Sequence, residues 1–98
     1  MSRDASPSDA DTIDAIKRAV ANLGKVTIRD MESSRRASAP WRQLAMWLCR
    51  HATRASYPAI GRAFGDKDHS TVMHACRVCA SNYPGPGEVM KTLGITVA

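Results

Sequence analysis

The 98-residue sequence has no long apolar run, and nothing in it approaches the ~20 consecutive apolar residues that a helix needs to cross a bilayer. Its opening, MSRDASPSDAD, is polar and acidic, unlike a secretory signal. Cysteine is scarce, with an odd number of residues at Cys49, Cys76 and Cys79. We therefore expect a cytoplasmic protein with reduced thiols and no contact with membranes.

Aromatic residues make up only 5% of the chain, and its β-branched residues are scattered rather than clustered. Strands are therefore not expected, whereas the abundant alanine favours helices. The sequence also lacks a glycine-rich loop that could cradle phosphate, and it has no second cluster of acid–base residues. These absences argue against an enzyme, and we expect no cofactor.

Charge is distributed unevenly along the chain. Residues 1–16 hold one arginine against four aspartates, a net charge of −3, whereas the remainder holds thirteen basic and five acidic residues, a net charge of +8. Ten of the fourteen basic residues are arginine, whose forked guanidinium suits phosphate and base edges. A basic domain behind an acidic leader indicates a polyanionic partner, usually nucleic acid, although an inert basic surface is the alternative.

Apolar spacing and capping residues predict one small all-α domain of about five to six helices. Residues 1–10 have the composition of a disordered acidic leader, so the domain is expected to span 11–98. Asp11 or Thr12 is a candidate cap for the first helix, and Thr27, with Asp30 three residues later, is the candidate cap for the second. We expect helices over residues 12–23, 27–31, 40–53, 57–64, 69–81 and 88–93, with 32–39 as a flexible basic loop. In the helix over 40–53, the inner face is expected to hold Leu44, Trp47 and Leu48, and the residues largely off that face are Arg42, Gln43, Met46 and Arg50.

Residues 56–81 read as two helices joined by a turn of three or four residues. Ser56 and Asp68 are suitable caps for the two helices, and Gly65 closes the first of them. The small residues Gly61 and Ala75 permit a close crossing. This pattern is typical of a helix-turn-helix.

The second of these helices lies in the cluster FGDKDHSTVMHACRVC, residues 64–79, which raises three chemical possibilities. Zinc is disfavoured, because Cys76 and Cys79 share the inner face while His69 and His74 are five residues apart. A catalytic relay within Asp68–Ser70 is disfavoured because consecutive residues on a helix point in different directions. We therefore predict no metal site, and buried thiols are the simpler interpretation of the two cysteines.

Contact with DNA accounts for more of this cluster. The start of the second helix is the part that enters the major groove in helix-turn-helix proteins. His69 and Ser70 can hydrogen-bond to base edges or phosphates, and Thr71 also offers a methyl group to thymine. Asp68 has the simpler alternative of acting only as an N-cap.

These residues also carry a family resemblance. The segment IGRAFGDKDHSTVMHA, residues 60–75, resembles the signature of the DNA-binding domain of DnaA, the bacterial replication initiator. The similarity extends back through RQLAM at 42–46, SRR at 34–36 and TIDAIKRAVAN at 12–22. It implies the C-terminal domain, domain IV, with a Trp-repressor-like helix-turn-helix fold that binds short duplex sites called DnaA boxes.

The resemblance also implies roles for individual residues. Arg35 or Arg36 matches the basic loop whose arginine enters the minor groove, with a solvated loop as the alternative. Positions along the DNA backbone are matched by Arg42, Gln43, Arg50 and Pro58. Positions that face the major groove are matched by Lys67, Asp68, His69, Ser70, Thr71 and His74, and Arg77 lies further along the same exposed side.

Two functional hypotheses follow. The first is a monomeric, stand-alone protein that binds DnaA-box-like double-stranded DNA and regulates replication initiation or transcription without ATPase activity, because the family's motor domain is missing from this sequence. The alternative is a protein-interaction module that modulates DnaA or its inactivating or loading partners. Exposed Trp41 or Trp47 would suit the second hypothesis, although helical spacing favours core packing for Trp47.

Overall fold

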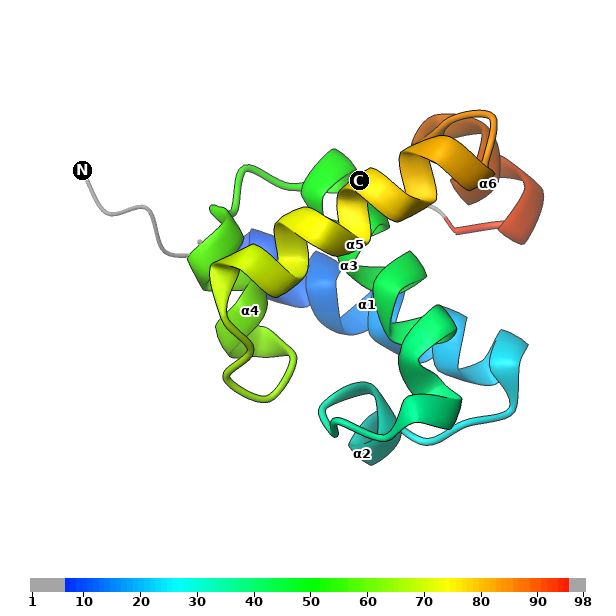
Figure 1. Ribbon diagram of the computed structural model, residues 1–98. Helices are drawn as coiled ribbons and strands as arrows, with labels where there is room; N and C mark the ends of the chain where they lie inside the picture. Colours follow the sequence, from blue (N-terminus) through cyan, green and yellow to red (C-terminus); the bar gives the residue numbers. More distant parts are fainter. Residues whose placement is uncertain (1–6, 96–98) are drawn as a thin grey trace.

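The computed structural model describes residues 7–95, and all regular structure in this range is helical (Figure 1). The elements are α1 (Pro7–Gly24), α2 (Ile28–Met31), the short 3-10 helix η1 (Arg36–Ser38), α3 (Ala39–Ala52), α4 (Tyr57–Ala63), α5 (His69–Asn82) and α6 (Pro86–Leu93). The predicted all-α class is thus confirmed, with six α-helices over the described range.

Helix α3 is the centre of the packing, and it contacts α1, α4, α5 and α6. Leu44 and Leu48 of α3 are buried together with Ile16 of α1, Ile60 of α4 and Val72 of α5. Such burial stabilises the fold by about 1.5–3 kcal/mol for each large apolar side chain. The core therefore holds α4 and α5 against a common support.

Burial on α3 extends beyond its predicted inner face. Trp47 is a core residue, as its spacing predicted, and its ring stacks on Tyr83 with 5.6 Å between centroids. Met46 and Arg42 were predicted to lie largely off that face, but both are buried. The prediction was wrong because α3 is covered by several helices, so one stripe does not account for its buried surface.

Helix α1 includes Pro7, five residues before the predicted start. Residues 7–10 of the predicted disordered leader are therefore helical, and residues 1–6 lie outside the described range. Neither Asp11 nor Thr12 is the N-cap; the Thr12 hydroxyl donates to the Ser8 carbonyl, 3.0 Å away, within the helix. Proline and aspartate both suit a first turn, so a polar turn precedes the apolar stripe.

Several predicted caps are confirmed. Thr27 and Asp30 form a reciprocal capping box at α2, with both hydrogen bonds at 3.0 Å. The Ser56 hydroxyl accepts from the Ala59 amide at the start of α4. Helix α6 begins at Pro86 rather than 88, because proline fits the first turn of a helix.

The predicted helix-turn-helix is formed by α4 and α5 (Figure 1). The turn folds back onto α4, where the Lys67 amide donates to the Gly61 carbonyl over 2.8 Å. A Cβ atom at Gly61 would overlap the Lys67 carbonyl oxygen, so this approach requires glycine. Gly65 and Asp66 then take left-handed backbone conformations, with φ of 82° and 58°.

Candidate nucleic-acid interface

The first half of α5 presents a polar stripe to solvent. We define the α5 stripe as the exposed residues Asp68, His69, Ser70, Thr71, His74 and Arg77. The opposite face of the helix, with Val72, Ala75 and Cys79, is buried in the core. All six residues of the stripe are thus held on a helix that is anchored along its other side.

Asp68 organises the start of this helix. Its carboxylate accepts from the Ser70 amide over 3.3 Å and from the Ser70 hydroxyl, and it lies 3.4 Å from the ring Nδ1 of His69. The predicted N-cap is therefore confirmed. Because Asp68 is engaged with its neighbours, the side chains of Thr71, His74 and Arg77 are the more independent members of the stripe.

Sequence reasoning missed Met73, which is 39% exposed between Thr71 and His74. An exposed methionine on a helix whose other face is buried adds an apolar contact to the polar stripe. Its spacing of four residues from both His69 and Arg77 placed it on the same side, and that signal could have identified it.

Lys67 was expected to face the major groove with the residues of the α5 stripe, but its side chain points elsewhere. Its Nζ donates to the carbonyl oxygens of Glu32 and Phe64, both 3.0 Å away. Burial lowers the pKa of this amine, and the nearby Arg42 charge adds to the effect. The physical reason is that the turn lies against the end of α2, where a carbonyl is within reach of the amine.

Glu32 is the point at which three segments meet. Lys17 of α1 is 4% exposed, and its Nζ lies 2.6 Å from both the Glu32 carboxylate and the Ala63 carbonyl oxygen. The same amine lies 5.2 Å from the centre of the Phe64 ring. Lys17 escaped the sequence analysis because it is charged, although it stands four residues after buried Ile13. These contacts join α1, the end of α2 and the end of α4.

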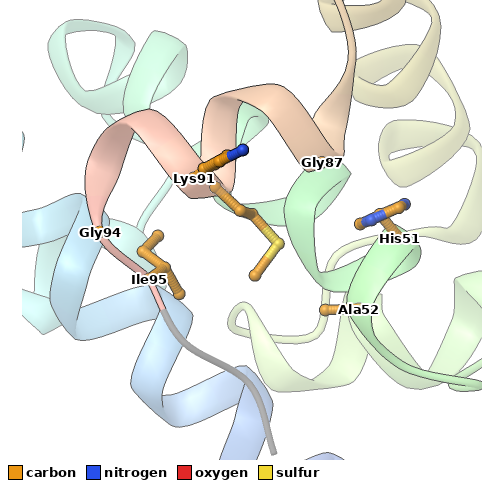
Figure 2. A pocket seen from close by; sticks show the side chains of 7 residues that line it. His51, Ala52, Gly87, Lys91, Gly94 and Ile95 are labelled. Atoms are coloured by element: carbon orange, nitrogen blue, oxygen red, sulfur yellow. The ribbon is translucent and has the colours of Figure 1, made fainter.

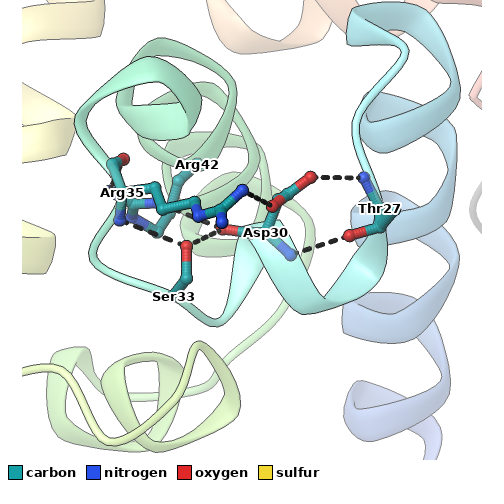
Figure 3. Close-up of polar contacts among 5 residues, drawn as sticks. All are labelled: Thr27, Asp30, Ser33, Arg35 and Arg42. Carbon is teal, nitrogen blue, oxygen red and sulfur yellow. Dashed lines mark hydrogen bonds and ion pairs between the residues drawn. The ribbon is translucent and has the colours of Figure 1, made fainter.

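Residues 32–38, which we call the arginine loop, are ordered by a compact set of polar contacts (Figure 3). The Ser33 hydroxyl donates to the Asp30 carbonyl oxygen and accepts from the Arg35 amide, at 2.8 and 3.2 Å. The loop was predicted to be flexible, but it contains η1 and these hydrogen bonds. It presents the exposed side chains of Arg35 and Arg36.

Arg42 was predicted to lie along the DNA backbone, but it is only 7% exposed. Its Nη1 and Nη2 atoms donate to the carbonyl oxygens of Asp30 and Arg35, both 3.1 Å away (Figure 3). The guanidinium therefore faces the inside of the arginine loop. A forked donor with two carbonyl acceptors satisfies a buried charge that helical periodicity alone assigns to the surface.

Two of the other predicted backbone contacts, Arg50 and Pro58, lie around the start of α4. Arg50 is exposed, its guanidinium carbon lies 4.4 Å from the centre of the Tyr57 ring, and its Nη1 donates to the Ala55 carbonyl over 2.8 Å. Pro58 is exposed in the first turn of α4, and Gln43 is half-buried on α3. Arg50 thus fixes the connection between α3 and α4 while its charge stays accessible.

The three cysteines are free, and Cys49 and Cys79 are buried. Burial raises the pKa of the Cys79 thiol to about 11 and also raises the pKa of Cys49 and Cys76. Over residues 7–95, no three His, Cys, Asp or Glu side chains converge in a way that could hold a metal ion. The two cysteines of the cluster therefore face the core while its histidines face solvent.

A pocket of about 460 Å³ lies between the end of α3 and α6 (Figure 2). His51, Met90, Lys91 and Ile95 contribute to its lining, which includes none of the predicted DNA-binding residues. Within the described range, no helix is both long and apolar enough to span a membrane.

Acid should weaken the local structure at Asp68, the N-cap of α5, and at Asp30, the acidic partner in the capping box of α2. Hydrogen bonds from Thr27 lower the pKa of Asp30 below its ordinary 3.8, and hydrogen bonds from Ser70 do the same for Asp68. A carboxyl with a depressed folded-state pKa stabilises the fold above its unfolded pKa, and this contribution is lost as the pH falls through the lower value.

We therefore expect the melting temperature of the protein to fall from about pH 5 downward. Circular dichroism melts of the wild type and of the double variant Asp30→Asn, Asp68→Asn would measure it. The variant keeps neutral capping groups, so its melting temperature should depend less on pH over this range. An identical pH dependence in the two proteins would contradict the assignment.

The family model described as the bacterial dnaA protein helix-turn-helix matches residues 13–78 of this chain, which is more than half of its length. The match includes the arginine loop and the whole of the α5 stripe, whereas α6 lies beyond it.

Curated relatives agree with this match. The chain is 51% identical over 71 residues to the chromosomal replication initiator protein DnaA of Aromatoleum aromaticum, covering 70% of this chain and 15% of the relative. It is 53% identical over 68 residues to the DnaA protein of Sphingopyxis alaskensis, covering 67% of this chain and 15% of the relative. The chain thus spans about 15% of the length of these relatives.

A crystal structure described as a DNA replication initiation factor has a similar fold, with a TM-score of 0.73 and 34% sequence identity. The likeness covers 88% of this chain and 28% of the other. The match, the sequence identities and the shared fold agree, and the chain therefore belongs to the family of the bacterial DnaA helix-turn-helix, the C-terminal domain of the replication initiator.

Proposed function

We propose that this chain binds double-stranded DNA at DnaA-box-like sites and regulates replication initiation or transcription, without ATPase activity of its own. The observation that carries the proposal is the exposure of the whole α5 stripe on a helix whose opposite face is buried. In helix-turn-helix proteins this end of the second helix enters the major groove. The relatives are named replication initiators, which supports the regulatory role.

The side chains of the stripe have complementary chemistry for base edges. His69, Thr71 and His74 can hydrogen-bond, and the methyl groups of Thr71 and Met73 can contact thymine. Arg77 can contact phosphate or guanine. Asp68 would act mainly as the N-cap, because its carboxylate already accepts from the amide and hydroxyl of Ser70.

Sequence-independent affinity would come from arginine. Arg35 or Arg36 would enter the minor groove from the arginine loop, while Arg50, with Gln43 and Pro58, would lie along the DNA backbone. Neutralised phosphates release counterions, so binding should weaken steeply as salt is added. Fluorescence anisotropy titrations at several salt concentrations would measure the slope.

Replacing Thr71 by alanine should weaken binding to a matched box by about 1–3 kcal/mol, roughly a 5- to 150-fold rise in Kd. The reason is that both a hydroxyl and a methyl group are lost from the centre of the stripe. Anisotropy with a labelled DnaA-box duplex and with a scrambled duplex of the same composition would measure the change.

The matched control is Thr92→Ala, which removes the same groups from an exposed position on α6. It should leave both affinities unchanged. Equal affinity of the wild type for the box and the scrambled duplex would refute sequence-specific binding. If Thr71→Ala binds the box duplex with the wild-type Kd, Thr71 does not contact the DNA.

A further inference from the structure

We propose that Arg42 is a positioning residue of the DNA interface, which holds the arginine loop so that Arg35 is presented to DNA, and is not itself a phosphate contact. This inference rests on the proposed function. The family resemblance implies instead that Arg42 contacts the DNA backbone. In the structure, however, its guanidinium points into the arginine loop.

The charge of Arg42 is buried. The side chain is 7% exposed, and its two terminal nitrogens are each hydrogen-bonded to a carbonyl oxygen. Three N–H groups of the guanidinium remain after these two bonds, but the side chain is buried, so to reach a phosphate the guanidinium would have to move outward and stretch both bonds. Both carbonyls would then lose a charged donor, and charge-assisted hydrogen bonds are the stronger kind.

The two carbonyls that accept from Arg42 belong to residues with further structural roles. One is that of Asp30, which completes the capping box of α2 and also accepts from the Ser33 hydroxyl. The other is that of Arg35, which also accepts from the Ser38 amide in η1 over 3.3 Å. Arg42 therefore clamps the end of α2 and the middle of the arginine loop to α3 (Figure 3).

Arg35 has an exposed side chain on a fixed backbone. Its side chain is 77% exposed, and its Nη1 lies 3.8 Å from the Asp30 carboxylate in a long ion pair. Its backbone, by contrast, is fixed through its amide and its carbonyl. The loop thus combines a held backbone with a charged side chain that can reach outward, which is what presentation to DNA requires.

A double-mutant cycle tests the proposal. We expect Arg42→Met and Arg35→Ala each to raise the Kd for a box duplex roughly tenfold, and the double variant to be no worse than either alone. In the Arg35→Ala background, Arg42→Met should also leave the slope of log Kd against log salt unchanged. A direct phosphate contact predicts instead a further tenfold loss and a slope reduced by roughly one.

Folding is controlled within the same experiment. All titrations are made below the melting temperature of each variant, and Arg42→Lys serves as a second variant that keeps the charge but not the fork. Because one amine cannot serve both carbonyls in the fork geometry, Arg42→Lys should lose binding nearly as Arg42→Met does. Wild-type affinity in Arg42→Lys would overturn the positioning role.

A measurement without DNA separates this inference from the proposed function. Amide hydrogen exchange in Arg42→Lys should speed up at Arg35 and Ser38 by at least roughly tenfold, while amides in the middle of α5 keep their protection. Unchanged exchange at Arg35 and Ser38 would refute the clamp. If the wild type binds no duplex, the proposed function is refuted. The exchange rates at Arg35 and Ser38 would still decide whether Arg42 holds the loop.

Discussion

Replacing Gly65 by alanine is expected to destabilise the protein by about 3 kcal/mol, because two separate penalties meet at this residue. Its φ of 82° is left-handed, which costs a residue with a Cβ about 1–2 kcal/mol. The added Cβ would also overlap the backbone carbonyl of Glu32, and such overpacking costs about 1–3 kcal/mol. Urea unfolding followed by circular dichroism would measure the sum.

Gly94 provides the matched control for this experiment. It is also left-handed, with φ of 71°, but a Cβ there would meet nothing within 4 Å. Gly94→Ala should therefore show the conformational penalty without the overlap. If Gly65→Ala and Gly94→Ala lower the free energy of unfolding by the same amount, the overlap with the Glu32 carbonyl does not contribute to the destabilisation.

This approach matters because it sets the distance between the two parts of the proposed interface. Glu32 begins the arginine loop, and Gly65 lies in the turn that leads to the α5 stripe. Lys67 donates to the Glu32 carbonyl from the same turn, and Lys17 contacts the Glu32 carboxylate from α1. The loop and the recognition helix are therefore held by shared contacts, so a shift of the turn should change DNA binding as well as stability.

Local signals account for what the sequence predicted well. Capping residues such as Thr27, Ser56 and Asp68 act within three residues of themselves, so their roles can be read without knowing the fold. The same holds for Gly65 at the end of α4. The exposure of His69 and Thr71 followed from the spacing of Val72, Ala75 and Cys79, which fixes the buried side of α5.

Three of the misjudged residues are long and cationic. Lys17, Arg42 and Lys67 each direct a charged head toward a backbone carbonyl that is distant in sequence or lies in a loop. Helical periodicity treats such residues as surface residues, although their aliphatic stems can be buried. Only the tertiary arrangement shows which carbonyls are in reach, so the sequence alone could not separate a positioning residue from a DNA contact.

Phe64→Ala is expected to have the largest effect on stability, about 3–5 kcal/mol, which is a substantial part of the ~5–15 kcal/mol available to a domain of this size. Phe64 is fully buried and is the largest of the completely enclosed side chains. Its ring closes the core at the end of α4 and supports the Lys17 amine. Thermal and urea unfolding would measure the loss.

Leu23→Ala is the control for this prediction, because Leu23 is apolar but 48% exposed and should lose much less stability. Phe64 lies outside the α5 stripe, so the folded fraction of Phe64→Ala, measured at low temperature, should still bind the box duplex. A stability loss no greater than that of Leu23→Ala would contradict the burial argument. A folded Phe64→Ala protein without DNA binding would instead mean that the ring also sets the orientation of α5, through the turn that it anchors.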